Sequence, residues 1–123
     1  MYCIMFEARK IVEFMAKDSG AKGDTINMED VCSFVLKVGS DQPLVTELCG
    51  IYHNFKAGEV LFVPQGWVCC EAVAANVPVV YGVRKSFMAK SAASLEAYKF
   101  ATELMRKSGR DVSRMQAIAK LLA

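Results

Sequence analysis

A glycine–proline–glycine spacing in the middle of the chain constrains its fold more than any other feature. Gly58 is followed after five residues by Pro64, and Gly66 comes two positions after that proline. Glycine adopts the positive φ that tight turns need, and proline removes a backbone donor at the tip of a strand. Because the apolar residues 60–63 precede the turn and Trp67 follows it, the segment predicts a strand, a tight turn and a second strand.

Short runs of β-branched and aromatic residues extend this β character over residues 44–87. Turn signals at 56–58, 64–66 and 75–78 separate the later runs. Such spacing is typical of an antiparallel sheet, for which we expect about four or five strands. The runs lie at 44–48, 50–55, 60–63, 68–73 and 79–83.

Apolar residues at helical spacing flank the β region on both sides. The helices predicted from this spacing are 4–17, 25–38, a helix from 91 or 94 to 107, and a last one that follows Asp111 as its N-cap. Residues 25–38 are ambiguous, because their β-branched content also fits a strand. Thr25 or Asn27 as an N-cap, followed by acidic residues in the first turn, favours a helix there.

The chain therefore divides into a mainly helical lead-in (1–43), a β region (44–87) and two C-terminal helices (88–123). Its length of 123 residues fits one domain. With 54% apolar and 23% charged residues, the composition is that of a globular protein. We predict a single α+β domain in which helices flank an antiparallel sheet.

The spacing of Gly58, Pro64 and Gly66 resembles the start of the second sequence motif of the cupin family. Trp67, directly after the turn, makes it similar to the corresponding turn in the Jumonji-C (JmjC) branch of that family. The resemblance covers residues 52–87, under a third of the chain. It implies a double-stranded β-helix, in which such a turn joins two strands of a barrel.

The same motif carries metal ligands in the family, and this chain lacks them. The family has a metal-binding histidine where this chain has Cys69, and an asparagine where it has Val73. His53 is the only histidine in the chain, so a site of two histidines and one carboxylate cannot be assembled from it. The resemblance therefore implies the scaffold of the family without its metal centre, and we expect no metal and no cofactor.

A complete barrel of this kind needs about eight strands, which is more than the sequence offers. Three interpretations remain open. Some early segments predicted as helices are strands, a second chain completes the barrel, or the fold is a degenerate half-barrel. The apolar start of the chain also raises the hypothesis that it is a piece of a longer protein. We carry forward a cupin-like half-barrel with flanking helices.

Strand alternation places every second side chain after the turn on one face of the sheet. The resemblance implies that this face, which includes Cys69 and Glu71, points into the barrel. An inward Glu71 needs a partner because an unpaired buried carboxylate is costly, and Arg84 is the candidate. Alternatively, Glu71 lies at a sheet end in solvent. The predicted pocket is lined by Trp67, Cys69, Glu71, Val73, His53 and Arg84.

The cysteine pattern favours reduced, packed thiols. The chain has five cysteines, an odd number, with no CxxC spacing, so a disulfide scaffold or a zinc ribbon is disfavoured. Cys49 or Cys69 near His53 is an alternative zinc or thiol-nucleophile site. It lacks the convergent ligands and the orienting residue that such sites need.

Charge is distributed unevenly along the chain. Residues 1–83 contain six Lys/Arg and ten Asp/Glu, a net charge of −4, whereas residues 84–123 contain nine and three, a net charge of +6. A basic segment attracts nucleic acid, anionic lipid or an acidic protein surface, including the acidic part of its own chain or of a neighbouring copy. Because the basic residues are spread along helices, nucleic acid is the disfavoured partner.

No apolar run approaches the length of about 20 residues that spans a bilayer, and charged residues interrupt the apolar N-terminus as they do not in a signal peptide. A soluble intracellular protein is expected. We predict a non-catalytic binding or assembly module that acts on an unidentified protein or as a homodimer. The alternatives are a small-molecule-binding or dioxygenase-like enzyme with atypical or externally supplied ligands and, more weakly, an anion or nucleic-acid binder.

Overall fold

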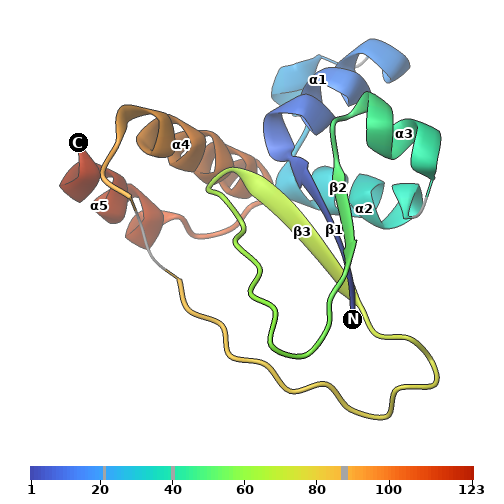
Figure 1. Cartoon of the computed structure of the whole chain (residues 1–123). Coiled ribbons are helices and arrows are strands. Elements are labelled where there is room, and N and C mark those ends of the chain that lie inside the picture. Colours follow the sequence, from blue (N-terminus) through green and yellow to red (C-terminus); the bar gives the residue numbers. More distant parts are fainter. Residues whose placement is uncertain (21, 40, 87–88) are drawn as a thin grey trace.

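The computed structural model describes residues 1–20, 22–39, 41–86 and 89–123 (Figure 1). The fold class is α+β, with one open antiparallel sheet. The predicted boundary at 87–88 lies outside the described residues. In chain order the elements are β1 (Tyr2–Glu7), α1 (Ala8–Ser19), the 3-10 helix η1 (Gly23–Thr25), α2 (Met28–Val38), α3 (Gln42–Glu47), β2 (Ile51–Asn54), β3 (Trp67–Ala72), α4 (Ala92–Lys107) and α5 (Ser113–Leu122).

The N-terminal strand β1 is the centre of the sheet, which has the strand order β2-β1-β3 with both pairings antiparallel. The prediction of a helix over 4–17 is therefore wrong up to Glu7, and the helix begins at Ala8. Residues 3–6 are all apolar and all buried. A strand buried on both faces lacks the alternation by which a strand is recognised.

The β region contains fewer strands than predicted. The runs at 50–55 and 68–73 correspond to β2 and β3, whereas 60–63 and 79–83 are irregular. Most of the run 44–48 is helix α3 instead of a strand. Together with β1 the described residues form a sheet of three strands, without the predicted half-barrel.

Short-range signals explain why α3 is a helix despite its β-branched residues. The side chain of Asp41 accepts a hydrogen bond from the backbone N–H of Leu44 at 3.2 Å, and Pro43 lies in the first turn. An aspartate N-cap and an early proline are both strong helix-start signals. They decide the local structure against the β propensity of Val45 and Thr46.

One face of the sheet packs on the helices and forms the hydrophobic core. Phe6 of β1 is fully buried, and Val68 and Cys70 of β3 pack against the same cluster. The alternation predicted for β3 is therefore confirmed on this side. The buried core residues are Ile4, Phe6, Ala8, Ile11, Val12, Ile26, Val31, Val35, Val38, Val45, Leu48 and Leu104.

The start of β2 fits the core only because it has glycine there. A Cβ atom on Gly50 would lie 2.2 Å from Cε1 of the Phe6 ring. The preceding residue, Cys49, has a positive φ of 52°, which is strained for a side chain other than glycine. The chain thus turns tightly from α3 into β2 and lies directly against the central aromatic residue.

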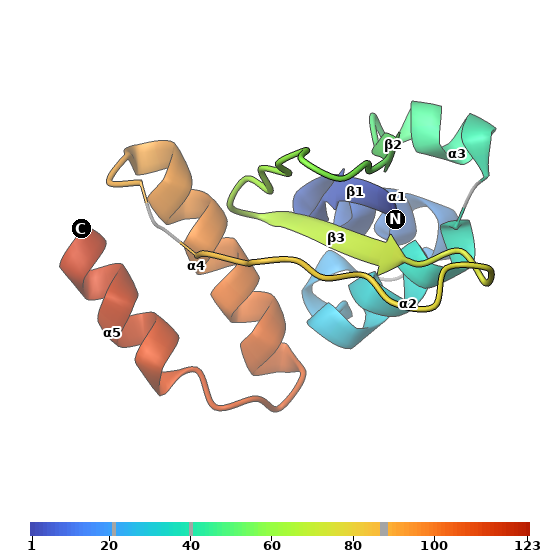
Figure 2. The same cartoon turned by 60° about the horizontal axis from the view of Figure 1, so that its bottom comes forward.

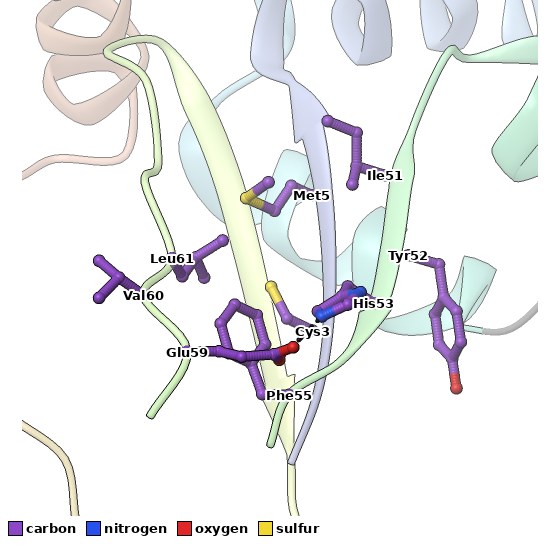
Figure 3. Close-up of a pocket in the computed structure, with 9 residues that line it drawn as sticks. All are labelled: Cys3, Met5, Ile51, Tyr52, His53, Phe55, Glu59, Val60 and Leu61. Carbon is purple, nitrogen blue, oxygen red and sulfur yellow. Dashed lines mark hydrogen bonds and ion pairs between the residues drawn. The ribbon is translucent and has the colours of Figure 1, made fainter. Parts of the chain in front are cut away.

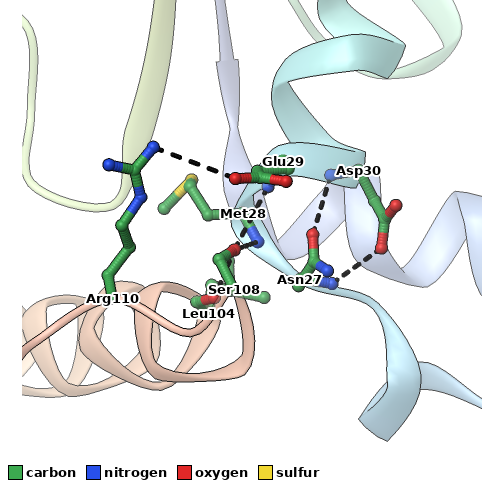
Figure 4. Close-up of polar contacts among 7 residues, drawn as sticks. All are labelled: Asn27, Met28, Glu29, Asp30, Leu104, Ser108 and Arg110. Atoms are coloured by element: carbon green, nitrogen blue, oxygen red, sulfur yellow. Dashed lines mark hydrogen bonds and ion pairs between the residues drawn. The ribbon is translucent and has the colours of Figure 1, made fainter.

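Helix α2 begins with a complete capping box, which resolves the ambiguity of residues 25–38. The side chain of Asn27 accepts from the N–H of Asp30, and the Asp30 carboxylate accepts from the N–H of Asn27, both at 3.0 Å. The hydroxyl of Ser108, after α4, also accepts from the N–H of Met28 at 3.0 Å (Figure 4). One residue after α4 thereby helps to satisfy the free backbone donors of α2.

The two predicted C-terminal helices are present and lie side by side at one end of the sheet (Figure 2), but the N-cap of α5 is Val112 instead of the predicted Asp111. Ser91 caps α4, and Asp111 accepts from the N–H of Ser113 at the start of α5. Leu104 of α4 is one of the buried core residues, so α4 packs against the core through this side chain. Among the described helices, none has the length and apolar character required to cross a membrane.

Candidate functional site

The face of the sheet opposite the core carries the candidate site. Cys3 and Met5 of β1 point to this face and are buried, with 2% and 5% exposed. In register, Cys3 lies opposite His53 on one side and Glu71 on the other, and Met5 lies opposite Cys69. This face therefore combines an apolar floor with thiol, imidazole and carboxylate groups.

A groove of about 400 Å³ opens on this face between β1, β2 and the segment after β2 (Figure 3). Pockets for small ligands have volumes of roughly 300–1,000 Å³ and a mostly apolar lining, so the groove is within the usual range. Its lining residues are Cys3, Met5, Ile51, Tyr52, His53, Phe55, Glu59, Val60 and Leu61.

His53 and Glu59 form a hydrogen bond at this groove. Nε2 of His53 lies 3.0 Å from Oε2 of Glu59, and the backbone N–H of Lys56 donates to the same oxygen at 2.9 Å. The hydrogen bond from Lys56, followed by the one with His53, lowers the pKa of the Glu59 carboxyl. Glu59 is therefore ionised at neutral pH, and the pair fixes the turn that leaves β2.

Two thiols meet beside the groove. The Sγ atoms of Cys3 and Cys69 are 2.9 Å apart, and both residues are free cysteines. Burial, followed by the hydrogen bond with Cys69, raises the pKa of Cys3 to about 12, and burial raises the pKa of Cys69 as well. Since the thiolate is the nucleophilic form, neither group is activated for nucleophilic attack at neutral pH.

Glu71 lies next to this thiol pair and contacts Arg84. Nη2 of Arg84 donates to Oε1 of Glu71 at 2.8 Å. The hypothesised partner is therefore in place, but the side chains are 80% and 33% exposed for Arg84 and Glu71. The idea of an inward, buried carboxylate is wrong, because Glu71 lies near the exposed end of β3.

The rest of the predicted pocket is dispersed. Trp67 lies at the far end of β3, beside α4, where it lines a separate cavity of about 170 Å³. Val73 follows β3 and is 46% exposed. Cys69, Glu71 and Arg84 come together, and His53 reaches the same face from β2. The predicted set is thus divided between two ends of the sheet.

The predicted turn at 64–66 is present, but it joins the irregular segment 60–63 to β3 instead of joining two strands. Gly58 and Gly66 have positive φ values of 87° and 82°, and the N–H of Trp67 donates to the carbonyl of Pro64 at 3.2 Å. A Cβ atom on Gly66 would lie 3.0 Å from Cβ of Ala97. In this chain the turn therefore seats β3 against α4.

The sequence reasoning missed Cys3, Met5 and Glu59, which lie at the centre of the site. Met5 was hidden because residues 4–17 were predicted as one helix, and Cys3 directly precedes that segment. The unbroken apolar run from Tyr2 to Phe6 was the signal for a fully buried strand. Glu59 gave no such signal, because its contact with His53 depends on how the turn folds back.

The described residues do not form a metal-binding cluster. Among them, no group of three or more His, Cys, Asp and Glu side chains is arranged to hold a metal ion. Cys49 lies before β2 and is exposed.

Searches against protein families, curated proteins and solved structures find no match to this chain. The cupin and JmjC resemblance remains a prediction.

Proposed function

We propose that this chain is a non-catalytic binding and assembly module that pairs with a second copy of itself. The observation that carries the proposal is the apolar stretch 79–83, which lies in irregular backbone outside the sheet. Tyr81 and Val83 are 93% and 101% exposed. Aromatic and β-branched residues fit a pleated, half-buried surface, and a contiguous apolar surface marks an interaction site.

The sheet offers the complementary surface. β2 and β3 are its two edge strands, and an exposed edge binds an added strand through backbone hydrogen bonds. Addition of 79–83 from a second copy would bring the sheet to about four strands, the cupin-like half-barrel that the sequence resemblance implies. In a two-fold dimer each copy would give and receive the same segment.

The charge distribution favours the same occupant. Residues 1–83 have a net charge of −4 and residues 84–123 a net charge of +6. In a two-fold dimer that places residues 84–123 of each copy against residues 1–83 of the other, these opposite charges attract. Such complementarity speeds association and sets orientation, and it weakens as salt is added.

The state of the site supports a non-catalytic role. Cys3 and Cys69 are held as protonated thiols, and His53 is engaged by Glu59 at 3.0 Å. A catalytic cysteine needs a thiolate or an adjacent base, and the Nε2 atom of His53 is hydrogen-bonded to Glu59. The residues of this face therefore provide contacts and shape.

The test is molar mass by light scattering on a size-exclusion column, over a hundred-fold range of concentration. We expect the wild-type mass to rise from one chain toward two. We expect the double variant Tyr81→Lys, Val83→Lys to stay at one chain, because lysine side chains on an edge strand oppose its pairing with another chain. Leu36→Lys is the matched control, since Leu36 is 68% exposed on α2, and it associates like the wild type.

Two results would contradict this proposal. One is a wild-type mass of one chain at every concentration. The other is association of the double variant with the same concentration dependence as the wild type. A third measurement at high salt tests the electrostatic contribution to association. We expect the molar mass to shift toward that of a single chain, because salt screens the attraction between the two copies.

The groove on the same face supports a second candidate, a small apolar ligand. Its apolar lining and the hydrogen-bonded pair of His53 and Glu59 have the composition of a ligand pocket. The probe is 1-anilinonaphthalene-8-sulfonate, whose fluorescence rises on binding. We expect Leu61→Asp to weaken binding and Leu121→Asp, on α5, to leave it unchanged. Equal binding by both variants would remove this candidate.

A further inference from the structure

We propose that Cys3 and Cys69 form a reversible disulfide between β1 and β3 when the protein meets a low-molecular-weight disulfide, such as oxidised glutathione. The two Sγ atoms are 2.9 Å apart, and both cysteines are free. The proposal is independent of self-association, because it concerns two strands that pair within one chain.

The strand register brings the two thiols together. Cys3 lies opposite Glu71, and Cys69 lies opposite Met5, so the cysteines are diagonal neighbours on one face of the sheet. An S–S bond is about 2.05 Å long, so the sulfur atoms need to approach by only about 0.9 Å, starting from 2.9 Å. Side-chain rotation provides most of a movement of this size.

The diagonal position also makes the bond readily reversible. Diagonal neighbours in an antiparallel pair have Cα atoms roughly 7–8 Å apart, whereas disulfides prefer about 4.4–6.8 Å. At such a separation, closing the bond needs a small shift between the two strands in addition to side-chain rotation. Strained disulfides have more oxidising potentials and open more easily, so we infer a switchable bond in place of a permanent cross-link.

The two thiols differ in access, which sets the order of reaction. Cys69 is half-buried and Cys3 is buried with 2% exposed. The oxidant therefore reaches Cys69 first. Cys70, the next residue on β3, packs against the core on the opposite face, and Cys32 and Cys49 are exposed thiols outside this pair.

The reaction is two thiol–disulfide exchanges. The Cys69 thiolate attacks one sulfur of the oxidant, which forms a mixed disulfide and expels one thiolate of the oxidant. The Cys3 thiolate then attacks Sγ of Cys69, forms the Cys3–Cys69 bond and expels the second thiolate. Two protein thiols are oxidised, one disulfide is reduced to two thiols, and the two protons lost by the cysteines are taken up by these products.

The environment makes this reaction depend on pH. Burial raises the pKa of both thiols, that of Cys3 to about 12. Only the thiolate attacks a disulfide, so the rate is low at neutral pH. Below these pKa values each exchange rises up to tenfold per pH unit, because the thiolate fraction does.

The experiment is peptide mapping of protein incubated with oxidised glutathione at pH 8.5, quenched with acid and digested with trypsin without a reductant. Cleavage after Arg9, Lys56 and Arg84 places Cys3 in the peptide 1–9 and Cys69 in the peptide 57–84. We expect these two peptides to be linked, with a mass two hydrogen atoms below their sum. Reduced dithiothreitol should release them.

Cys70 is the matched control, because it lies in the same tryptic peptide as Cys69. We expect Cys70→Ser to retain the link and Cys69→Ser to lose it. In Cys3→Ser the reaction stops at a glutathione adduct on Cys69. Fragmentation of the linked wild-type peptide between Cys69 and Cys70 gives the same assignment without any variant.

The proposal is overturned if peptides 1–9 and 57–84 remain separate while Cys32 and Cys49 carry glutathione. It is overturned equally if the link is assigned to Cys70. The glutathione adducts at the exposed cysteines show that the oxidant was active in the same sample.

Discussion

The two faces of β1 differ in what covers them. Phe6 and Ile4 point to helices α1 and α2 and belong to a cluster of twelve buried residues. Cys3 and Met5, the alternating residues of the same strand, point to a face bordered by irregular chain and a groove. Figure 1 shows the segment after β3 running away from the sheet before it returns to α4.

This difference indicates that the helix face of β1 stabilises the fold and that the opposite face is available for interactions. The helix face buries apolar side chains against regular elements with satisfied backbone groups, which is where most folding free energy arises. The opposite face keeps thiols, a hydrogen-bonded histidine–glutamate pair and exposed valines.

The largest effect is expected at Phe6. Phe6→Ala removes a fully buried ring and should lower the free energy of unfolding by about 3–5 kcal/mol. Met5→Ala, on the groove face, should cost about 2 kcal/mol, the low end for such a change. Urea unfolding measures both values, and equal losses would remove the distinction between the faces.

Gly50→Ala tests the tightest contact of the helix face. The added Cβ would meet Cε1 of Phe6 at 2.2 Å, and overpacking of this kind costs about 1–3 kcal/mol. Gly58→Ala is the control for backbone strain, because its φ is 87° but nothing lies within 4 Å of its Cβ position. A smaller loss for Gly50→Ala than for Gly58→Ala would mean that the ring moves aside.

The groove face should make the free energy of unfolding sensitive to alkaline pH. Because the folded pKa of Cys3 is raised from 9.0 to about 12, its contribution to stability is complete below pH 9 and is lost as the pH rises toward 12. Wild-type stability should therefore fall over that range more steeply than that of Cys3→Ala. Cys32→Ala, at an exposed thiol, should follow the wild type, and parallel curves for all three proteins would contradict the assignment.

The smallest effect is expected at the ion pair of Glu71 and Arg84. Surface ion pairs contribute about 0–1 kcal/mol, and the Arg84 side chain is 80% exposed. Arg84→Ala should therefore change the free energy of unfolding by less than about 1 kcal/mol. A loss of several kcal/mol in thermal unfolding would show that the carboxylate is buried after all.

The sequence was informative where structure is decided locally. Asn27 and its capping box start α2, Ser91 starts α4, and Gly58 and Gly66 adopt the positive φ of a turn. The alternation along β3 also follows from period-two geometry. Each of these features depends on a few neighbouring residues.

The sequence was misleading where structure depends on distant contacts. β1 is central because β2 and β3 pair with it from more than 40 residues away, and its uniform burial erases the periodic signal. Residues 79–83 have strand propensity but lie outside the sheet of this chain. The β propensity of a segment indicates that its residues fit a sheet, but it does not predict which strand they pair with.

Hydrogen–deuterium exchange at low and high protein concentration tests the central claim most directly, because it follows both faces in one sample. The account predicts that α2 is equally protected at both concentrations, whereas residues 79–83 exchange rapidly in dilute protein and become protected at high concentration. Rapid exchange of 79–83 at both concentrations would contradict it, because these residues would then have no partner in a second copy.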